Sequence, residues 1–380
     1  MKKILFIMVT ATLFVLPQAF ASKARMTALG QDSDGSFYVD DARNIFLNPA
    51  KLNSFTNSVN LEWGTTARGA TGFAEGGFAR DFGGYNLAVQ LGRQSNAESS
   101  INNIINGLAP FNANAASNFM VPNNTAEVIG AFKSGGMDVG ISVLFGFSED
   151  KAAENAFPNK EAGTLQLRGG VAQDKWNAFA YFDVIHNSKN ETAASTENEY
   201  EQDVVAGLGG EYMVGKNSKA FLDFDYGAVK AKDATPTVDY EVKAMAITLG
   251  YAKKHDKDGA MLFYSAGIEY LDGEQKEKEA DASQDIKGTS IPLVIGVEGK
   301  ATDWLMLRGS VSQNILLDNV EGAADDKSSH PANTTVVAAG ASFTFGKFQI
   351  DGVLGGSGGT GSGALNANTL FVNTSLNYNF

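Results

Sequence analysis

From about residue 57 to residue 380, apolar and polar side chains alternate with a period of two. In MDVGISVLFGF (137–147), every second position is Met, Val, Ile or Phe, and the positions between are mostly Asp, Gly and Ser. This period indicates a β-strand with one apolar and one wetter face. The chain contains about sixteen such runs: 57–66, 71–80, 84–93, 125–134, 137–147, 163–173, 176–186, 203–213, 218–228, 240–253, 259–271, 290–300, 303–314, 334–346, 347–354 and 369–380.

The connections between these runs alternate in length. Short turns such as DFGG and SGG are followed by long polar stretches, of which 94–124 is the longest. A soluble sandwich has no reason to place its long connections at one end, whereas a transmembrane barrel does. The pattern predicts an all-β fold, a transmembrane antiparallel β-barrel of about sixteen strands. A barrel of fourteen strands is the alternative. Six aromatic residues fall where headgroup girdles are expected: Trp63, Trp176, Tyr212, Tyr251, Trp304 and Tyr378.

The first 21 residues have the pattern of a signal peptide. Lys2 and Lys3 precede an apolar run, and Ala19-Phe20-Ala21 provides a small-x-small cleavage site. The run is short and contains Pro17, which disfavours a membrane-anchoring helix. We therefore expect export through the general secretory route and cleavage after Ala21.

Composition excludes several kinds of site. The chain has 42 Gly, 25 Phe, 11 Tyr and no Cys, so disulfides and thiolate metal sites are ruled out. A formal charge of −13 argues against a nucleic-acid partner. The segment DSDGS (32–36) lacks the third acid of a calcium loop, and the three histidines are far apart in the sequence. We expect no cofactor, no metal and no enzymatic activity.

The chain ends on LFVNTSLNYNF, an alternating strand with a terminal aromatic residue. Leu370, Leu376, Tyr378 and Phe380 carry the apolar side of the pattern. This ending resembles the C-terminal assembly signal of bacterial outer-membrane proteins. The resemblance implies recognition by the barrel-assembly machinery and residence among the lipids of a Gram-negative outer membrane.

Residues 22–56 do not alternate. They contain Ala28-Leu29-Gly30, Asp40-Asp41-Ala42, Ile45-Phe46-Leu47 and Asn48-Pro49-Ala50. The segment resembles the one that follows the signal peptide in the long-chain fatty-acid-transporter-like outer-membrane family. That resemblance implies a plug inside the barrel. The chain is then expected to have three parts: signal peptide 1–21, plug-like segment 22–56 and barrel 57–380. From the residues alone, VDDARNIFLN (39–48) predicts a short helix that Asp40 and Asp41 favour at its start and that ends before Pro49.

If the apolar faces of the strands meet lipid, the polar faces line the lumen. This alternation of faces predicts twelve pore-lining residues: Glu62, Gln90, Asp138, Arg168, Glu211, Asp223, Asp225, Lys243, Glu269, Glu298, Arg308 and Asp351. Such a set favours a water-filled interior, and its excess of acids favours cations. The first interpretation is a porin for passive diffusion of small hydrophilic solutes, either monomeric or a homotrimer. The alternative is a plugged, substrate-specific transporter of the fatty-acid-transporter type for a hydrophobic compound, or a structural barrel.

Within the 94–124 connection, Ile101, Ile104, Ile105 and Leu108 recur at helical spacing. Exposure of this apolar stripe to water would be unfavourable, so we expect the connection to fold into the barrel and constrict it. A helix resting on the rim or at a subunit contact is the alternative.

Overall fold

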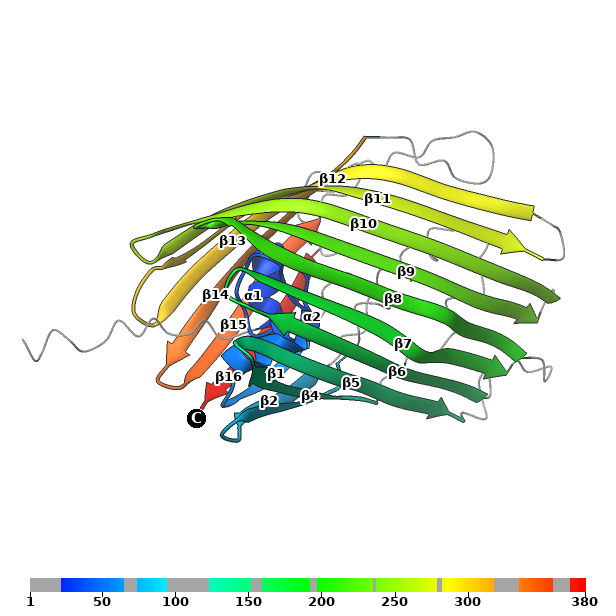
Figure 1. Cartoon of the computed structure of the whole chain (residues 1–380), viewed down its shortest axis with the longest axis horizontal. Coiled ribbons are helices and arrows are strands. Elements are labelled where there is room, and N and C mark those ends of the chain that lie inside the picture. The colour runs from blue at the N-terminus through cyan, green and yellow to red at the C-terminus, as the bar shows by residue number, and fades with distance from the viewer. Residues whose placement is uncertain are drawn as a thin grey trace, which may run out of the picture.

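The computed structural model describes residues 22–64, 74–93, 122, 124–151, 159–191, 197–234, 237–278, 282–317, 335–357 and 370–380. The signal peptide and the predicted constriction residues 101–108 therefore lie outside the described residues. The described part is a closed antiparallel barrel of sixteen strands around a short N-terminal segment (Figure 1). The strands are β1 (Ser58–Gly64), β2 (Glu75–Asp81), β3 (Tyr85–Leu91), β4 (Thr125–Ser134), β5 (Met137–Asp150), β6 (Asn159–Ala172), β7 (Trp176–Glu191), β8 (Glu197–Gly215), β9 (Ser218–Ala234), β10 (Thr237–Lys257), β11 (Ala260–Glu277), β12 (Ala282–Lys300), β13 (Leu305–Leu316), β14 (Val336–Phe345), β15 (Phe348–Ser357) and β16 (Leu370–Asn379).

Each strand pairs with its neighbours in sequence, and β1 pairs with β16 to close the ring. The register of this seam runs from Ser58 opposite Asn379 to Gly64 opposite Asn373. Among the sixteen described strands, closure leaves no sheet edge unpaired, which a strand structure in lipid requires. The predicted all-β barrel and its count of sixteen strands are confirmed.

The two ends of the barrel differ. Tight turns close one end, where the backbone of Phe380 donates to the Asn57 carbonyl oxygen at 3.0 Å. Gly135 and Gly136 form one of these turns with φ values of 57° and 81°, as a two-residue hairpin needs. At the other end, β8 to β12 are 17 to 21 residues long, whereas β1 to β3 have seven each. Figure 1 shows these long strands projecting on one side of the barrel.

The two faces of the wall differ as the alternation predicts. Outward-facing positions carry large exposed apolar side chains, such as Ile141, Leu249 and Ile295. In β16, Asn373, Ser375 and Asn377 are instead buried inside. An apolar outer band around a polar interior is the arrangement of outer-membrane barrels. Within the described residues, no helix is long and apolar enough to cross a membrane.

The plug segment (residues 22–56) lies inside the barrel (Figure 1). Its helices are α1 (Lys23–Ala28), α2 (Asn44–Leu47) and the 3-10 helix η1 (Pro49–Ser54). The predicted helix over 39–48 is shorter than expected and begins at Asn44. Asp40 and Asp41 therefore lie before the N-cap residue Arg43 and not in the first turn, and the Asp41 carboxylate accepts from the backbone of Arg43 at 2.9 Å and pairs with Arg25. The predicted end before Pro49 agrees with the extended backbone of Asn48.

Candidate functional site

The structure places eleven of the twelve predicted pore-lining residues on the inner face of the wall. Glu62, Gln90, Arg168, Glu298, Arg308 and Asp351 are buried there. Asp138 and Glu211 contact the plug segment, through Asn53 and Lys51 respectively. Asp223, Asp225 and Glu269 line a cavity.

Lys243 is the exception, and its predicted position was wrong. Thr248 of β10 lines the same cavity as Asp223 and Glu269. The even-numbered positions of β10 therefore face inward, and Lys243 faces outward. Its partner is Glu241 on the same outer face, at 2.9 Å. The inward neighbours Val242 and Ala244 are buried. Because β10 continues past the apolar band, its outer face is also charged there, and polarity no longer distinguishes the two faces.

Arg43 of the plug segment is held by three carboxylates. It lies 2.9 Å from Asp34, 3.2 Å from Glu62 of β1, and also pairs with Glu75 of β2. Lys23 pairs with Glu75 at 2.7 Å, and its backbone nitrogen donates to Glu62 at 2.6 Å. Arg43 is 1% exposed, so these charges compensate one another away from water.

Arg93 continues this network on the opposite side of Asp34. It bonds Asp34 at 2.5 Å and pairs with Glu127 of β4. The guanidinium carbons of Arg43 and Arg93 lie 4.5 and 4.6 Å from the centre of the Phe46 ring. Phe46 thus contacts the cations that the carboxylates hold.

A second network fixes α1 to the other side of the wall. Arg25 forms two 2.9 Å bonds to Glu298 of β12 and also binds Asp41. Glu298 pairs in turn with Arg308 of β13 at 2.9 Å. Arg308 reaches Asp351 of β15 at 3.0 Å. Ion pairs therefore join the plug segment to wall strands on both sides of the seam.

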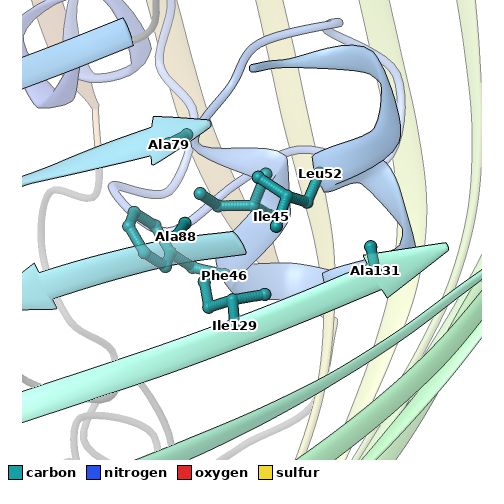
Figure 2. Packing of buried hydrophobic residues seen from close by; sticks show 7 residues of the cluster. All are labelled: Ile45, Phe46, Leu52, Ala79, Ala88, Ile129 and Ala131. Carbon is teal, nitrogen blue, oxygen red and sulfur yellow. The ribbon is translucent and has the colours of Figure 1, made fainter. Parts of the chain in front are cut away.

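Apolar packing adds to these charges. Ile45, Phe46 and Leu52 of the plug segment pack against small or aliphatic side chains of the wall (Figure 2). The wall residues of this cluster are Ala79, Ala88, Ile129 and Ala131. Alanines at these inward positions leave room for the larger side chains of the plug segment.

The predicted plug motif docks on two wall strands. Asn48 accepts from the backbone of Ala50 at 3.0 Å and donates to the Val171 carbonyl oxygen at 3.1 Å. A Cβ on Gly140 of β5 would collide with Pro49 and Ala50, and one on Gly170 of β6 with Asn48. These two glycines allow the Asn-Pro-Ala motif to lie directly on the backbone of the wall.

Asp40 lies near the short-turn end. Its carboxylate is 2.8 Å from Lys254 and 3.7 Å from Lys219. Burial alone would raise the pKa of Asp40, but the two ammonium groups lower it to about 2. Asp40, Lys219 and Lys254 line a polar cavity of about 280 Å³ at this end, together with Tyr38.

A cavity of about 320 Å³ lies between residues 30–47 and the wall strands β6, β7 and β9 to β12. We call it the lumenal cavity. Tyr38 lines both this cavity and the polar cavity at the short-turn end. Five aromatic side chains line the lumenal cavity: Phe37, Tyr38, Phe179, Tyr181 and Phe221.

The aromatic lining was not predicted from the sequence. Phe179, Tyr181 and Phe221 lie on inward positions, yet the inner face was assigned from polar residues alone. A signal is present across the strands. Gly209, Gly207 and Gly250 are their respective cross-strand partners, and a Cβ on any of them would collide with the facing ring.

No protein-family model matches the chain, and no curated protein sequence is similar to it. Among solved structures, CdiB from Acinetobacter baumannii matches with 10% identity and a TM-score of 0.44, over 85% of this chain. This chain spans only 59% of the length of CdiB. The monoaromatic hydrocarbon channel CymD matches with 11% identity and a TM-score of 0.41, over 95% of this chain and 98% of that one. The toluene transporter TodX of P. putida matches with 12% identity and a TM-score of 0.39, over 92% and 96%.

A loop-deletion mutant of OmpT, an outer membrane protein of Vibrio cholerae, matches with 10% identity and a TM-score of 0.37, over 85% of this chain and 97% of that one. At these identities and TM-scores the likeness says nothing about a substrate. The chemistry of the interior therefore has to come from the side chains of this chain.

Proposed function

We propose that this barrel is a plugged outer-membrane transporter that binds small aromatic molecules in the lumenal cavity. The observation that carries the proposal is the group of five aromatic side chains around a cavity of about 320 Å³. Phe37 stacks on Phe221 with ring centres 5.1 Å apart, and on Phe179 at 6.0 Å. Apolar walls with a few polar groups are typical of small-molecule sites.

The plug segment favours a specific transporter over an open porin. The polar inner face, which suggested a water-filled pore, is largely occupied with holding residues 22–56. Glu62, Glu75 and Glu298 each pair with a lysine or arginine of this segment. A porin needs a continuous aqueous path, and the buried ion pairs of the plug segment lie across the lumen.

Single-channel recording separates these two functions. We expect the mature chain in a planar bilayer to show no large, steady conductance steps. A variant that lacks residues 22–56 should show them, because the lumen of a sixteen-strand barrel is wide enough to conduct ions. Large steady steps from the intact chain would contradict the plugged transporter and restore the porin.

Ligand binding tests the cavity itself. Fluorine NMR relaxation of 4-fluorobenzyl alcohol, measured with the detergent-solubilised chain, should report saturable binding. Thr248→Trp should abolish it by filling the cavity. Thr374→Trp is the matched control, because Thr374 lies on the outward side of β16, between the inward Asn373 and Ser375. Equal relaxation with both variants would mean that the ligand only partitions into the micelle.

A further inference from the structure

We propose that the lumenal cavity selects organic cations, such as an aromatic ring that carries an ammonium group, over neutral aromatic molecules. This inference rests on the proposed function and specifies its substrate class. Five carboxylates line the cavity with the aromatic rings, and the inference is carried by the three that belong to the wall: Asp223 and Asp225 of β9 and Glu269 of β11.

The register of three adjacent strands sets the positions of these acids. Thr248 of β10 pairs with Asp223 on one side and with Glu269 on the other. Neighbouring strands are about 4.8 Å apart, so the backbones of Asp223 and Glu269 are about 10 Å apart, with Thr248 between them. Asp225 lies two positions from Asp223 and thus on the same face. The acids surround a space that one ammonium group can enter.

These carboxylates lack the counter-charges found elsewhere in the lumen. Among the residues that the structure describes, no lysine, arginine or histidine forms a salt bridge with Asp223, Asp225 or Glu269. By contrast, the carboxylates that hold the plug segment, such as Glu62 and Glu298, are each paired with a cation. In the described part of the chain, cations therefore pair with the acids that anchor the plug segment, whereas the three wall acids of the cavity form no salt bridge.

Arg168 is the one cation among the described residues that line the cavity. Its guanidinium donates to the carbonyl oxygen of Phe46 and to the Gln166 side chain, the latter at 3.0 Å. It also lies over the Tyr181 ring, 5.2 Å from its centre. Arg168 is thus committed to the plug segment and to β6, and one positive charge cannot balance three carboxylates.

The aromatic rings determine what kind of cation fits. The faces of Phe and Tyr rings attract ammonium groups, and the same rings provide apolar contact for an organic body. A small hydrated metal ion would gain nothing from this apolar surface. Tyr181 bridges the two features, because its hydroxyl donates to Asp225 while its ring lines the cavity.

The experiment compares three fluorinated ligands of one shape: 4-fluorobenzylammonium, 4-fluorobenzyl alcohol and 4-fluorobenzoate. Each is titrated into the full mature chain in detergent at pH 8, with Thr248→Trp as the blocked reference. We expect the cation to bind at least about tenfold more tightly than the alcohol, and the anion not to bind. Asp223→Asn combined with Glu269→Gln should bring the ratio of the two affinities, cation over alcohol, close to one.

Glu274→Gln is the matched control, because Glu274 lies on the outward face of β11 and pairs with Lys276 at 3.1 Å. This variant should keep the preference for the cation. If the alcohol binds as tightly as the cation, the cation inference fails and the proposed function stands. If no ligand distinguishes the wild-type chain from Thr248→Trp, both fail. A preference that survives in the double variant would overturn the role of these carboxylates.

Discussion

The ring of Phe221 lies directly over Gly250, its cross-strand partner, so closely that Gly250 has no space for a Cβ. Tyr181 lies in the same way over Gly207. The far end of each ring therefore lies over the backbone of the neighbouring strand. The glycines keep the lumenal cavity open while its surface remains aromatic.

Gly250→Ala should push the Phe221 ring away from the wall and into the cavity. Overpacking of this kind costs about 1–3 kcal/mol, which divides between lower barrel stability and weaker ligand binding. The fluorine NMR titration with 4-fluorobenzyl alcohol, together with thermal unfolding followed by circular dichroism, measures both. Gly169→Ala is the control, since Gly169 is a strand glycine whose Cβ would meet no atom within 4 Å. Equal binding by the two variants would contradict the role assigned to Gly250.

Arg43→Met should release the plug segment. It would leave Asp34, Glu62 and Glu75 with fewer cations, and uncompensated buried charges of this kind cost about 3–5 kcal/mol. We expect conductance steps in a planar bilayer, whereas the intact chain should show none. Arg80→Met is the control, because Arg80 is exposed and lies over the ring of Phe380 at 5.7 Å. A silent Arg43→Met barrel that folds normally would show that the apolar contacts alone hold the segment.

The ion pairs of Asp40 predict a response to acid. Lys219 and Lys254 lower the pKa of Asp40 to about 2 against the burial that would raise it, whereas an unfolded aspartate titrates near 3.9. The pairing thus contributes fully above about pH 4, and its contribution is lost as the pH falls towards 2. The open probability of the barrel in a planar bilayer should therefore rise as the pH falls from about 4 to about 2.

Asp40→Asn should remove that part of the response and raise the open probability at neutral pH. Protein surrounds Asp40 closely enough to oppose its ionisation, yet 60% of its side chain still contacts water, so the effect should be small and weaker still in 1 M KCl. An identical pH profile for the Asp40→Asn variant and the wild-type chain would show that other carboxylates control the response.

Phe380→Ala should reduce the yield of assembled barrel. The Phe380 ring stacks on Tyr378 at 6.4 Å, and Tyr378 contacts Phe348 at 4.6 Å, so the terminal aromatic completes an exposed cluster beside the seam. The heat-modifiable shift in gel mobility of membrane-assembled protein measures the folded fraction. Tyr85→Ala removes an exposed aromatic at the same end and should assemble normally. Similar losses for both would argue for a general aromatic contribution rather than a terminal signal.

The sequence predicts where strands occur and which side chains face outward, because lipid imposes a strict alternation. The sequence does not predict how long each strand is. The pattern predicts β10 over 240–253, whereas the strand runs from Thr237 to Lys257. Glu241 and Lys243 lie on its outer face at the end of the barrel opposite the tight turns. Both faces of the strand are polar there, so apolar and polar residues no longer alternate.

The interior was predicted only in part, and the reason is the same throughout. The alternation of strand faces places Glu62 and Glu298 in the lumen. It cannot show that they pair with Arg43 and Arg25 of the plug segment. Nor does it place Phe221 opposite Gly250, since this requires the register between strands. The cavity is a property of that register and of the plug segment together.

The seam between β1 and β16 fixes the order in which the parts of the molecule come together. Because the first strand pairs with the last, the ring cannot close until all the strands between them are in place. The plug segment leads directly into β1, so it is attached to one of the two strands that form the seam. Until the seam forms, both edge strands present unpaired backbone groups, a hazard for aggregation that has to be shielded on the way to the membrane.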